Sequence, residues 1–367
     1  FGRRFVMRFA HISDMHLGLA LNGYSFLEDQ KYIMDQMSDI ILKNNVDAVF
    51  ISGDIYDKPF PPEEAVSIFD RFISEISNAG KYIYVIPGNH DSAVRLSFGA
   101  DILKGQNVYI AKAYNGNVEK YTFEDKYGEI GIFLLPFIKP VDVRSFFPDK
   151  EINDNFNKMM GAVLENVDAN FQKRNIILSH QFLQGSKRAD NGKVITGMYD
   201  AINPEVYDGF DYVAMGHLHN EQYVENGRIR YCGTPLKYSK FESNCRKSIT
   251  FGEIREKGDL TLWDEELSPM KDMRVISGTF DEIKDIKTDD YVHIVLKGPD
   301  NDPDMYSTLR DNLPNIMSYT CSDNFAQAEP DNMIENDTLL YFEEFFAQRM
   351  GRDLNEKERT ILLNLIN

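Results

Sequence analysis

Long apolar runs and cysteines are both scarce in this sequence of 367 residues. No apolar run reaches the roughly 18 residues of a membrane span, and the first residues lack the apolar core of a secretory signal. The three cysteines, Cys232, Cys245 and Cys321, are widely spaced and form no metal-type pair. We therefore expect free thiols, a reducing compartment and a cytoplasmic location, with no membrane association.

Basic residues are also few, since 40 Lys and Arg face 58 Asp and Glu, for a net charge of −18. From Lys271 onward, 10 basic and 20 acidic residues give −10, which leaves −8 for residues 1–270. Phosphate contacts need Lys and Arg, so this composition argues against a protein that grips nucleic acid unaided. A nucleic-acid enzyme is still compatible if divalent metals occupy its site and a partner supplies basic surface.

The first half of the chain alternates two kinds of apolar pattern. Segments 5–13, 46–52 and 81–87 are predicted strands, and segments 27–45 and 61–80 are predicted amphipathic helices. This alternation predicts an α/β domain with a largely parallel sheet. Shorter apolar runs between residues 107 and 254 predict a second set of strands, which completes a domain of residues 1–270.

The remainder of the chain is predicted to form two further units. Residues 271–328 are expected to be a small α+β domain, because 289–321 has a strand, helix, strand pattern. The acidic stretch 322–338 is typical of a linker, and 339–367 of aromatic-rich helices, so 329–367 is predicted to be a linker and helical tail. That tail could pack on its own domain. We favour docking on a partner, because a linker precedes it.

Polar residues follow five predicted strands directly. They are Asp14, His16, Asp54, Asn89, His90, Asp91, His180, His217 and His219. A single histidine at a strand end is most often structural. Five of the chain's seven histidines share this placement, however, and ligands of open α/β sheets collect at the carboxyl ends of strands. The sequence therefore predicts that these side chains converge on one site.

Their chemistry is that of a metal site. With His90 set aside, two carboxylates, one amide oxygen and four imidazoles suit Mn²⁺, Fe²⁺ or Zn²⁺ better than Ca²⁺. Seven ligands are too many for one four-coordinate zinc. Two ions would need a bridging group, for which Asp54 is the natural candidate. Such pairs hold an attacking hydroxide and a phosphoryl oxygen, so the predicted reaction is phosphoester hydrolysis.

The series of motifs resembles the calcineurin-like metallophosphoesterases. It consists of D-x-H at 14–16, G-D at 53–54, G-N-H-D at 88–91, a lone histidine at 180 and G-H-x-H at 216–219. Each motif alone is weak, but the ordered series is specific. The similarity is closest to bacterial DNA nuclease subunits of this family, through stretches such as "HISDMHLG" and "GNHDSAVRLSFGADIL", and it spans most of residues 1–270.

The resemblance implies a fold and a set of residue roles. The implied fold is a four-layer α-β-β-α sandwich with a small α+β cap domain and a C-terminal helical tail. Two divalent ions, most simply Mn²⁺, are implied. One would be held by Asp14, His16, Asp54 and His219, and the other by Asp54, Asn89, His180 and His217. His90 would contact the scissile phosphate as general acid or charge stabiliser. Asp91 would either orient it or cap a turn.

The resemblance also implies a biological setting. The substrate would be DNA, cut at ends and hairpins as exonuclease or endonuclease in double-strand-break processing. The C-terminal helices would bind a coiled-coil ATPase, and the chain would form a homodimer within a heterotetramer. Asp57 stands where archaeal and eukaryotic members have a histidine, so their exonuclease details are not carried over. Among the basic residues, Lys237 is the best candidate for a phosphate contact.

Two other functions use the same sequence features. A small-molecule phosphodiesterase or a protein phosphatase would need the same metal motifs. A scaffold subunit that mainly organises the ATPase would need the tail but not the ligands, and the nearly complete ligand set disfavours it. Comparing the hydrolysis of DNA with that of cyclic nucleotides and phosphopeptides separates a nuclease from the phosphodiesterase and the phosphatase. The scaffold hypothesis is tested by asking whether the complex needs the metal ligands for its function in cells.

Overall fold

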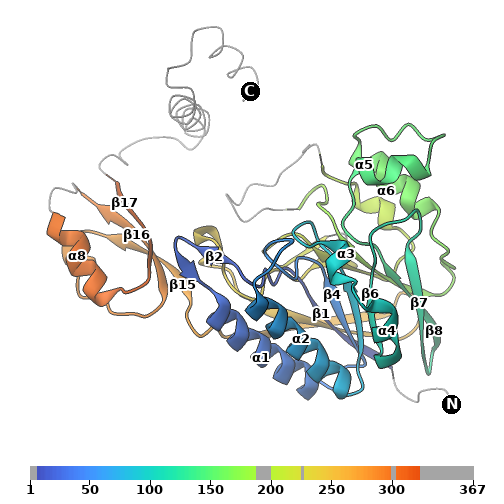
Figure 1. Cartoon of the computed structure of the whole chain (residues 1–367), viewed down its shortest axis with the longest axis horizontal. Helices are drawn as coiled ribbons and strands as arrows, with labels where there is room; N and C mark the ends of the chain where they lie inside the picture. The colour runs from blue at the N-terminus through green and yellow to red at the C-terminus, as the bar shows by residue number, and fades with distance from the viewer. Residues whose placement is uncertain (1–5, 187–199, 225–226, 299–302, 323–367) are drawn as a thin grey trace, which may run out of the picture.

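The computed structural model describes residues 6–186, 200–224, 227–298 and 303–322 (Figure 1). The predicted linker and helical tail, residues 329–367, lie outside these ranges. Within them, no helix is both long and apolar enough to cross a membrane. All three cysteines are free thiols, as predicted.

Two six-stranded sheets form the body of the molecule, each with four adjacent parallel strands. The first has the order β14 (Leu260–Glu266), β13 (Ser248–Ile254), β1 (Met7–Ile12), β4 (Ala48–Ser52), β5 (Tyr82–Ile86) and β6 (Val108–Ile110), and its parallel strands are β1, β4, β5 and β6. The second has the order β11 (Gln222–Val224), β12 (Ile229–Tyr231), β10 (Tyr212–Gly216), β9 (Arg174–His180), β8 (Gly128–Leu134) and β7 (Glu119–Asp125). Here β12, β10, β9 and β8 are parallel. The predicted parallel α/β core is confirmed.

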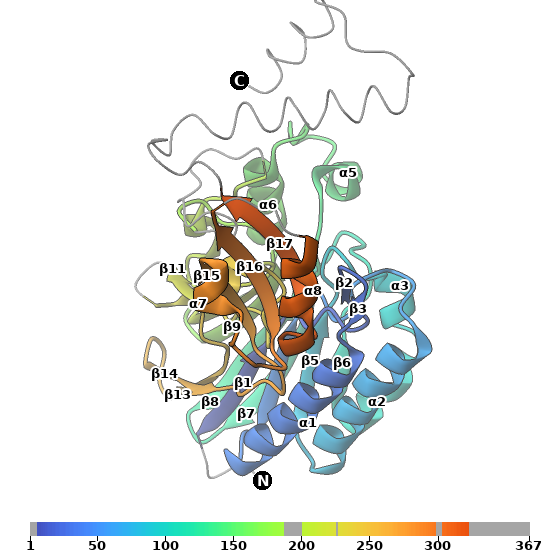
Figure 2. The same cartoon turned by 90° about the vertical axis from the view of Figure 1, so that its left-hand side faces the viewer.

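Helices cover the outer face of each sheet. They are α1 (Leu27–Lys43), α2 (Glu63–Asn78), α3 (Ala93–Leu96), α4 (Ala100–Leu103), α5 (Pro140–Val143) and α6 (Phe156–Glu165), with 3₁₀ turns η1 (Lys104–Gln106), η2 (Arg144–Phe146), η3 (Pro204–Tyr207) and η4 (Lys240–Glu242). Figure 2 shows α1 and α2 side by side, and the Ser38 hydroxyl of α1 donates to Glu75 of α2 at 2.7 Å. Helix α2 begins after Pro62 and ends before Gly80, as its sequence predicts.

Alternating side chains divide the apolar residues into three layers. On β4, Phe50 packs between the sheets, whereas Val49 and Ile51 pack against α1 and α2. On β9, Ile176 points between the sheets and Ile177 toward α6. The result is the α-β-β-α sandwich that the motifs implied, and it brings the carboxyl ends of both sets of parallel strands to one region.

A separate three-stranded sheet follows strand β14 of the first sheet in the chain (Figure 1). Its strands β15 (Met273–Gly278), β16 (Tyr291–Lys297) and β17 (Ile316–Ser322) are all parallel, with α7 (Phe280–Ile283) and α8 (Pro303–Asn312) as connections. The predicted strand, helix, strand pattern is present as β16, α8 and β17, and β15 adds a third strand. Apolar residues such as Val292, Ile294 and Leu309 give this unit its own core.

This small unit contacts the first domain beside the hairpin β2 (Ala20–Leu21) and β3 (Tyr24–Ser25). The Tyr291 ring stacks on Phe26 with centroids 4.5 Å apart, and its hydroxyl donates to Asp29 at 2.8 Å. The Asn22 amide donates to the Met317 carbonyl at 2.7 Å. The hairpin lies only a few residues after Asp14 and His16, so the small unit packs against the segment that follows the first predicted ligands.

A buried ion pair joins the two sheets at the end opposite the predicted ligands' strand ends. Both amino groups of Arg174 bind the carboxylate of Asp125, at 2.6 and 3.0 Å, and the guanidinium also donates to the carbonyl of Arg255. Asp125 in turn accepts the backbone N–H of Met7 at 2.9 Å. The pair therefore ties β7 and β9 of one sheet to β1 and β13 of the other.

We predict that Arg174→Ala lowers the free energy of unfolding by about 3–5 kcal/mol, because it leaves a buried carboxylate without its counter-ion. Urea denaturation followed by circular dichroism measures the change. The neighbouring Lys173→Ala, which breaks the solvent-exposed pair with Glu129, is the control and should cost less than about 1 kcal/mol. Equal, small losses in both variants would show that Arg174 does not join the sheets.

Candidate metal centre

The predicted site residues follow the carboxyl ends of five parallel strands. Asp14 and His16 follow β1, Asp54 follows β4, and the segment with Asn89 and His90 follows β5; His180 is the last residue of β9, and His217 and His219 follow β10. Strands β1, β4 and β5 belong to one sheet, and β9 and β10 to the other. The predicted side chains therefore gather in one place, with both sheets contributing.

The backbone at this place is held in unusual conformations. Asparagines aside, four non-glycine residues of the described chain have positive φ angles: Asp14 (53°), His16 (46°), Asp54 (50°) and His217 (98°). All four belong to the predicted ligand set. Left-handed backbone costs roughly 1–2 kcal/mol at such residues, and it persists where surrounding structure enforces it. Here the N–H groups of Asp14 and His16 bond the carbonyls of Gly53 and Asp54 at 2.9 and 3.0 Å.

Two glycines allow the chain segments to approach each other closely. A Cβ atom at Gly88 would collide with the carboxylate and backbone nitrogen of Asp54, and one at Gly216 would collide with the Ser52 carbonyl and His180. The G-N-H-D and G-H-x-H motifs thus need their glycines for steric reasons.

His180 and Asn89 lie together on one side of Asp54. The Nδ1–H of His180 donates to the Ser52 carbonyl at 2.7 Å, which directs its Nε2 toward the centre. That Nε2 lies 3.3 Å from Asp54 Oδ2 and 3.0 Å from Asn89 Oδ1. Asn89 Oδ1 also lies 2.9 Å from Nδ1 of His217. These four residues present donor atoms to one another at distances that one cation could share.

His16 and His219 also lie close together. His16 is buried, its Nε2 has no hydrogen-bond partner, and this atom is 3.8 Å from Asp54 Oδ2. The ring of His219 is 5.1 Å from that of His16. Asp14 has a carboxylate oxygen within 4.8 Å of donor atoms of Asp54 and His180. Its carboxylate accepts the Ser13 hydroxyl and, at 2.9 Å, the N–H of His217. A buried nitrogen without a partner indicates an absent ligand.

A buried carboxylate that sequence reasoning missed supports His219. Glu242 in η4 accepts the Nδ1–H of His219 at 3.3 Å, the Thr234 hydroxyl at 3.1 Å and the Lys247 ammonium. Burial by itself raises the pKa of Glu242, but Lys247 and His219 lower it to about 2. An ionised carboxylate behind a histidine fixes the tautomer in which Nε2 faces a metal. No motif marks Glu242, because only the fold brings it to His219.

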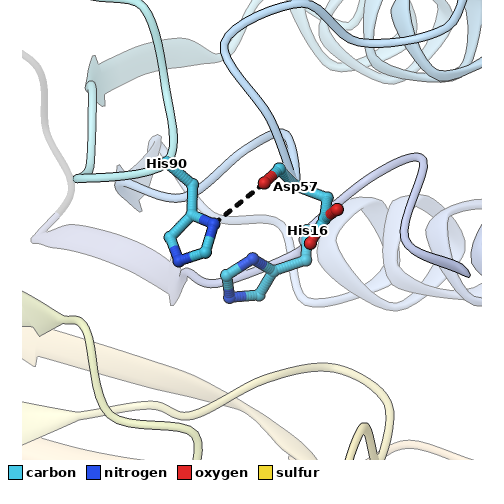
Figure 3. Close-up of side chains that lie close together, drawn as sticks. All are labelled: His16, Asp57 and His90. Carbon is cyan, nitrogen blue, oxygen red and sulfur yellow. Dashed lines mark hydrogen bonds between the residues drawn. The ribbon is translucent and has the colours of Figure 1, made fainter. Parts of the chain in front are cut away.

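His90 lies beside the predicted ligand His16, and one donor atom each of His16, Asp57 and His90 lie within 4.8 Å of one another. Figure 3 shows its Nδ1 directed at the Asp57 carbonyl, at 2.8 Å, so that this nitrogen donates and Nε2 is left for another partner. Its ring packs edge-on to His16, 4.8 Å between centroids. The backbone N–H of His90 donates to Asp54 Oδ1 at 2.9 Å, which anchors the segment to the centre.

Asp91 makes the contacts of a turn cap, one of its two expected roles, and Lys237 has a carboxylate partner. The Asp91 carboxylate accepts the N–H groups of Ile55, Tyr56 and Gly88 at 2.9 to 3.1 Å, so it clamps two loops and caps a turn, while the His90 ring is held by Asp57. Lys237, the candidate for a phosphate contact, instead pairs with Asp272 at 2.9 Å.

Charge at the centre is only partly balanced by the protein. Asp14 and Asp54 are both buried, and burial raises the pKa of Asp14 to about 6. Burial would lower the pKa of His180, but the Asp54 carboxylate outweighs it and raises that pKa to about 9. Burial lowers the pKa of His16 to about 3, so this imidazole is neutral, the form that binds metals. Buried carboxylates, neutral imidazole and an unpartnered nitrogen together fit divalent cations.

The sequence is similar to two protein families and to a known nuclease subunit. The sequence model described as calcineurin-like phosphoesterase matches residues 7–221, and one described as type 5 capsule protein repressor C-terminal domain matches residues 269–350. The SbcD subunit of the nuclease SbcCD from Staphylococcus epidermidis is 28% identical over 375 residues, which cover 98% of each chain.

Solved structures also match. A dimetal phosphatase from Danio rerio is 14% identical, with a TM-score of 0.42, over 72% of this chain and 98% of its own. The protein TT1561 of Thermus thermophilus is 8% identical, with a TM-score of 0.38, over 71% of this chain and 99% of its own. The family model matches more than half of the sequence and includes the strand ends that carry Asp14, Asp54, His90 and His180. The chain therefore belongs to the calcineurin-like phosphoesterase family.

Proposed function

We propose that this protein is a Mn²⁺-dependent DNA nuclease, the nuclease subunit of an SbcCD-type complex that processes double-strand breaks. The convergence of six further nitrogen and oxygen donor residues around Asp54 carries the proposal of two metals. The similarity to a nuclease subunit over 98% of both chains supports the proposal of DNA as substrate. Exonuclease and endonuclease action on ends and hairpins, in the cytoplasm, are part of the same proposal.

The proposed ligand sets are those that the family resemblance implies. One ion would be held by Asp14, His16, Asp54 and His219, and the other by Asp54, Asn89, His180 and His217. Mixed imidazole and oxygen ligands without thiolate suit Mn²⁺. When bound, such a pair supplies positive charge that activates a water and neutralises the phosphoryl oxygens. The protein holds the donor atoms in fixed positions. The strained backbone contributes to this, and hydrogen bonds hold His180 to the Ser52 carbonyl and His219 to Glu242.

His90 is proposed to act on the phosphate and not on the metals. Its Nδ1–H is held by the Asp57 carbonyl, so Nε2 is the atom that would hold a proton for the leaving oxygen or donate to a phosphate oxygen. Asp57 holds the His90 ring through its main-chain carbonyl, so this contact does not depend on the side chain of residue 57. An aspartate would therefore be compatible with the site where archaeal and eukaryotic members have a histidine.

The domain division is proposed as residues 1–270 for the nuclease domain, 271–328 for a cap and 329–367 for the linker and helices that bind SbcC, a coiled-coil ATPase. The match of the second family model to residues 269–350 is in line with a boundary near 270. The separate sheet of β15, β16 and β17 supports a distinct cap.

A homodimer within a heterotetramer is proposed, and an exposed apolar surface supports the homodimer. Phe60, Val94, Phe98 and Ile102 are between 73 and 87% exposed, on and beside α3 and α4. They adjoin an apolar cavity of about 430 Å³, lined in part by Val66 and Phe69 of α2. Large apolar side chains grouped on a surface in this way are typical of a protein interface.

The function is tested by a nuclease assay with a defined variant. His90→Asn should reduce cleavage of labelled blunt and hairpin duplexes by about 10²–10⁴-fold, because proton transfer or charge stabilisation is lost. Its affinity for Mn²⁺, measured by calorimetry, should stay within about twofold of wild type, because no ligand is changed. Adding the ATPase should stimulate the wild type. Normal cleavage by His90→Asn would refute its role, and a preference for cyclic nucleotides or phosphopeptides over DNA would refute the proposed substrate.

Glu242→Gln is predicted to weaken Mn²⁺ binding roughly 10- to 100-fold, because His219 loses the carboxylate that orients it. Calorimetric titration of the metal-free protein measures this, and circular dichroism checks that the variant is folded. Glu266→Gln is the matched control, since Glu266 pairs with Arg246 on the surface. Wild-type affinity in folded Glu242→Gln would exclude the support of His219 by Glu242.

Phe98→Glu is predicted to convert the dimer to a monomer, because a charge would be buried in an apolar interface. Light scattering after size-exclusion chromatography gives the mass at several concentrations. Val141→Glu on α5, which also replaces an exposed apolar residue, should leave the mass unchanged. A Phe98→Glu protein with the wild-type mass would place the interface elsewhere or exclude a dimer.

A further inference from the structure

One accessible aromatic side chain next to the metal centre has no role in the proposed chemistry. Phe137 follows β8, and its ring is nearly parallel to that of His217, at 16° and 6.3 Å between centroids. It meets the His180 ring edge-on at 6.1 Å. Phe182 also contacts His217 but is only 2% exposed, so it belongs to the core. Phe137 is partly exposed, on the same side as the accessible residues Asn89 and His217.

Phe137 is mounted on a rigid segment. Its own N–H donates to the carbonyl of Pro87 at 3.0 Å, two residues before Asn89. The Gln181 side chain, directly after His180, donates to the carbonyl of Ile138 at 3.0 Å. The segment is thus bonded to the two loops that carry Asn89 and His180 of the second proposed ligand set. The Phe137 segment is therefore fixed relative to these two proposed ligands.

A cation accompanies the ring. The ammonium of Lys139 lies 5.7 Å from the Phe137 centroid, the residue is exposed, and it makes no ion pair with any residue in the described ranges. Many other Lys and Arg side chains around the first domain are engaged in ion pairs, as Lys237 is with Asp272. An aromatic face with an unpaired ammonium beside it is the combination that binds a nucleotide, because the base stacks and the phosphate pairs.

We propose that Phe137 is a stacking platform for a nucleobase next to the scissile phosphate, and that Lys139 contacts a neighbouring phosphate. The inference rests on the proposed nuclease function and deepens it. A metal centre alone accepts any phosphoester, whereas a platform at a fixed distance favours substrates that carry a base beside the reacting phosphate. Phe137 is thus a residue that selects nucleic acid over small phosphoesters.

The experiment compares ordinary DNA with DNA that lacks a base. Duplexes carry a single abasic residue at each of the three terminal nucleotides in turn, on the strand that the wild type cleaves. Phe137→Ala should lower kcat/KM on ordinary DNA roughly 10- to 100-fold, as expected for the loss of one stacked base. On the abasic duplex that removes the stacked base, Phe137→Ala and wild type should agree within about twofold, because there is nothing left to stack.

Further variants separate stacking from packing. Phe137→Trp should retain wild-type activity, because it keeps an aromatic face, whereas Phe137→Leu should behave like Phe137→Ala despite its apolar bulk. Lys139→Gln should weaken cleavage of ordinary and abasic DNA equally, because a phosphate contact does not depend on the base. Fluorescence anisotropy in EDTA should reproduce the same pattern as changes in DNA affinity, without any contribution from metal.

Each outcome decides between the proposals. If Phe137→Ala loses activity equally on ordinary and on every abasic DNA, or loses none, the platform is refuted and the nuclease function stands. If Phe137→Leu equals the wild type, the side chain only shields the histidines and the platform is again refuted. A wild type that cleaves no DNA but hydrolyses bis(p-nitrophenyl) phosphate with Mn²⁺ refutes the nuclease proposal, and the platform with it.

Discussion

Two buried carboxylates, Asp14 and Asp54, impose a demand for positive charge on which the rest of the centre depends. Each follows a central parallel strand, and neither has an arginine or lysine beside it in the described chain. An uncompensated buried charge is costly, so cations, or protonated imidazoles such as His180, have to supply the balance. No lysine or arginine of the described chain neutralises these two carboxylates. Divalent metal ions, which members of this family use, can therefore supply the positive charge.

Holding the ligands in place requires strain, and the sandwich around them offsets it. Four predicted ligands have positive φ angles, and Gly88 and Gly216 permit approaches that no other residue allows. Such conformations persist because both sheets have closely packed apolar layers on each face and strand-end hydrogen bonds between the loops. The same packing therefore stabilises the fold and fixes the geometry of the centre. A loosened core should relax the ligand loops before the strands themselves separate.

Sequence patterns predicted the strand ends and the ligand types because both are local. An apolar run followed by Asp-x-His or Gly-Asn-His-Asp is visible in a few residues, and parallel strands bring such ends together. The supporting residues were not predictable in the same way. Glu242 and Phe137 reach the centre only through contacts across more than twenty residues of chain, and neither carries a motif. Asp91 was visible, but its three backbone partners depend on how two loops meet. Lys237 was visible too, but its carboxylate partner Asp272, which lies more than thirty residues later in the chain, was not.

The acidity of the chain bears on how a nucleic acid would be held. Several basic residues are occupied inside the fold: Arg174 binds Asp125, Arg230 binds Glu221 and Asp264, and Lys247 binds Glu242. These cations maintain the sandwich and the histidine support, so they are not available to phosphates. A DNA substrate would then depend on three other sources of affinity: metal ions at Asp54, base stacking near the centre and basic surface on a partner. Stacking is insensitive to the net charge of the protein, whereas phosphate contacts are not. A strongly acidic protein would thus be able to bind DNA when the affinity comes from metal ions, an aromatic surface and an associated subunit.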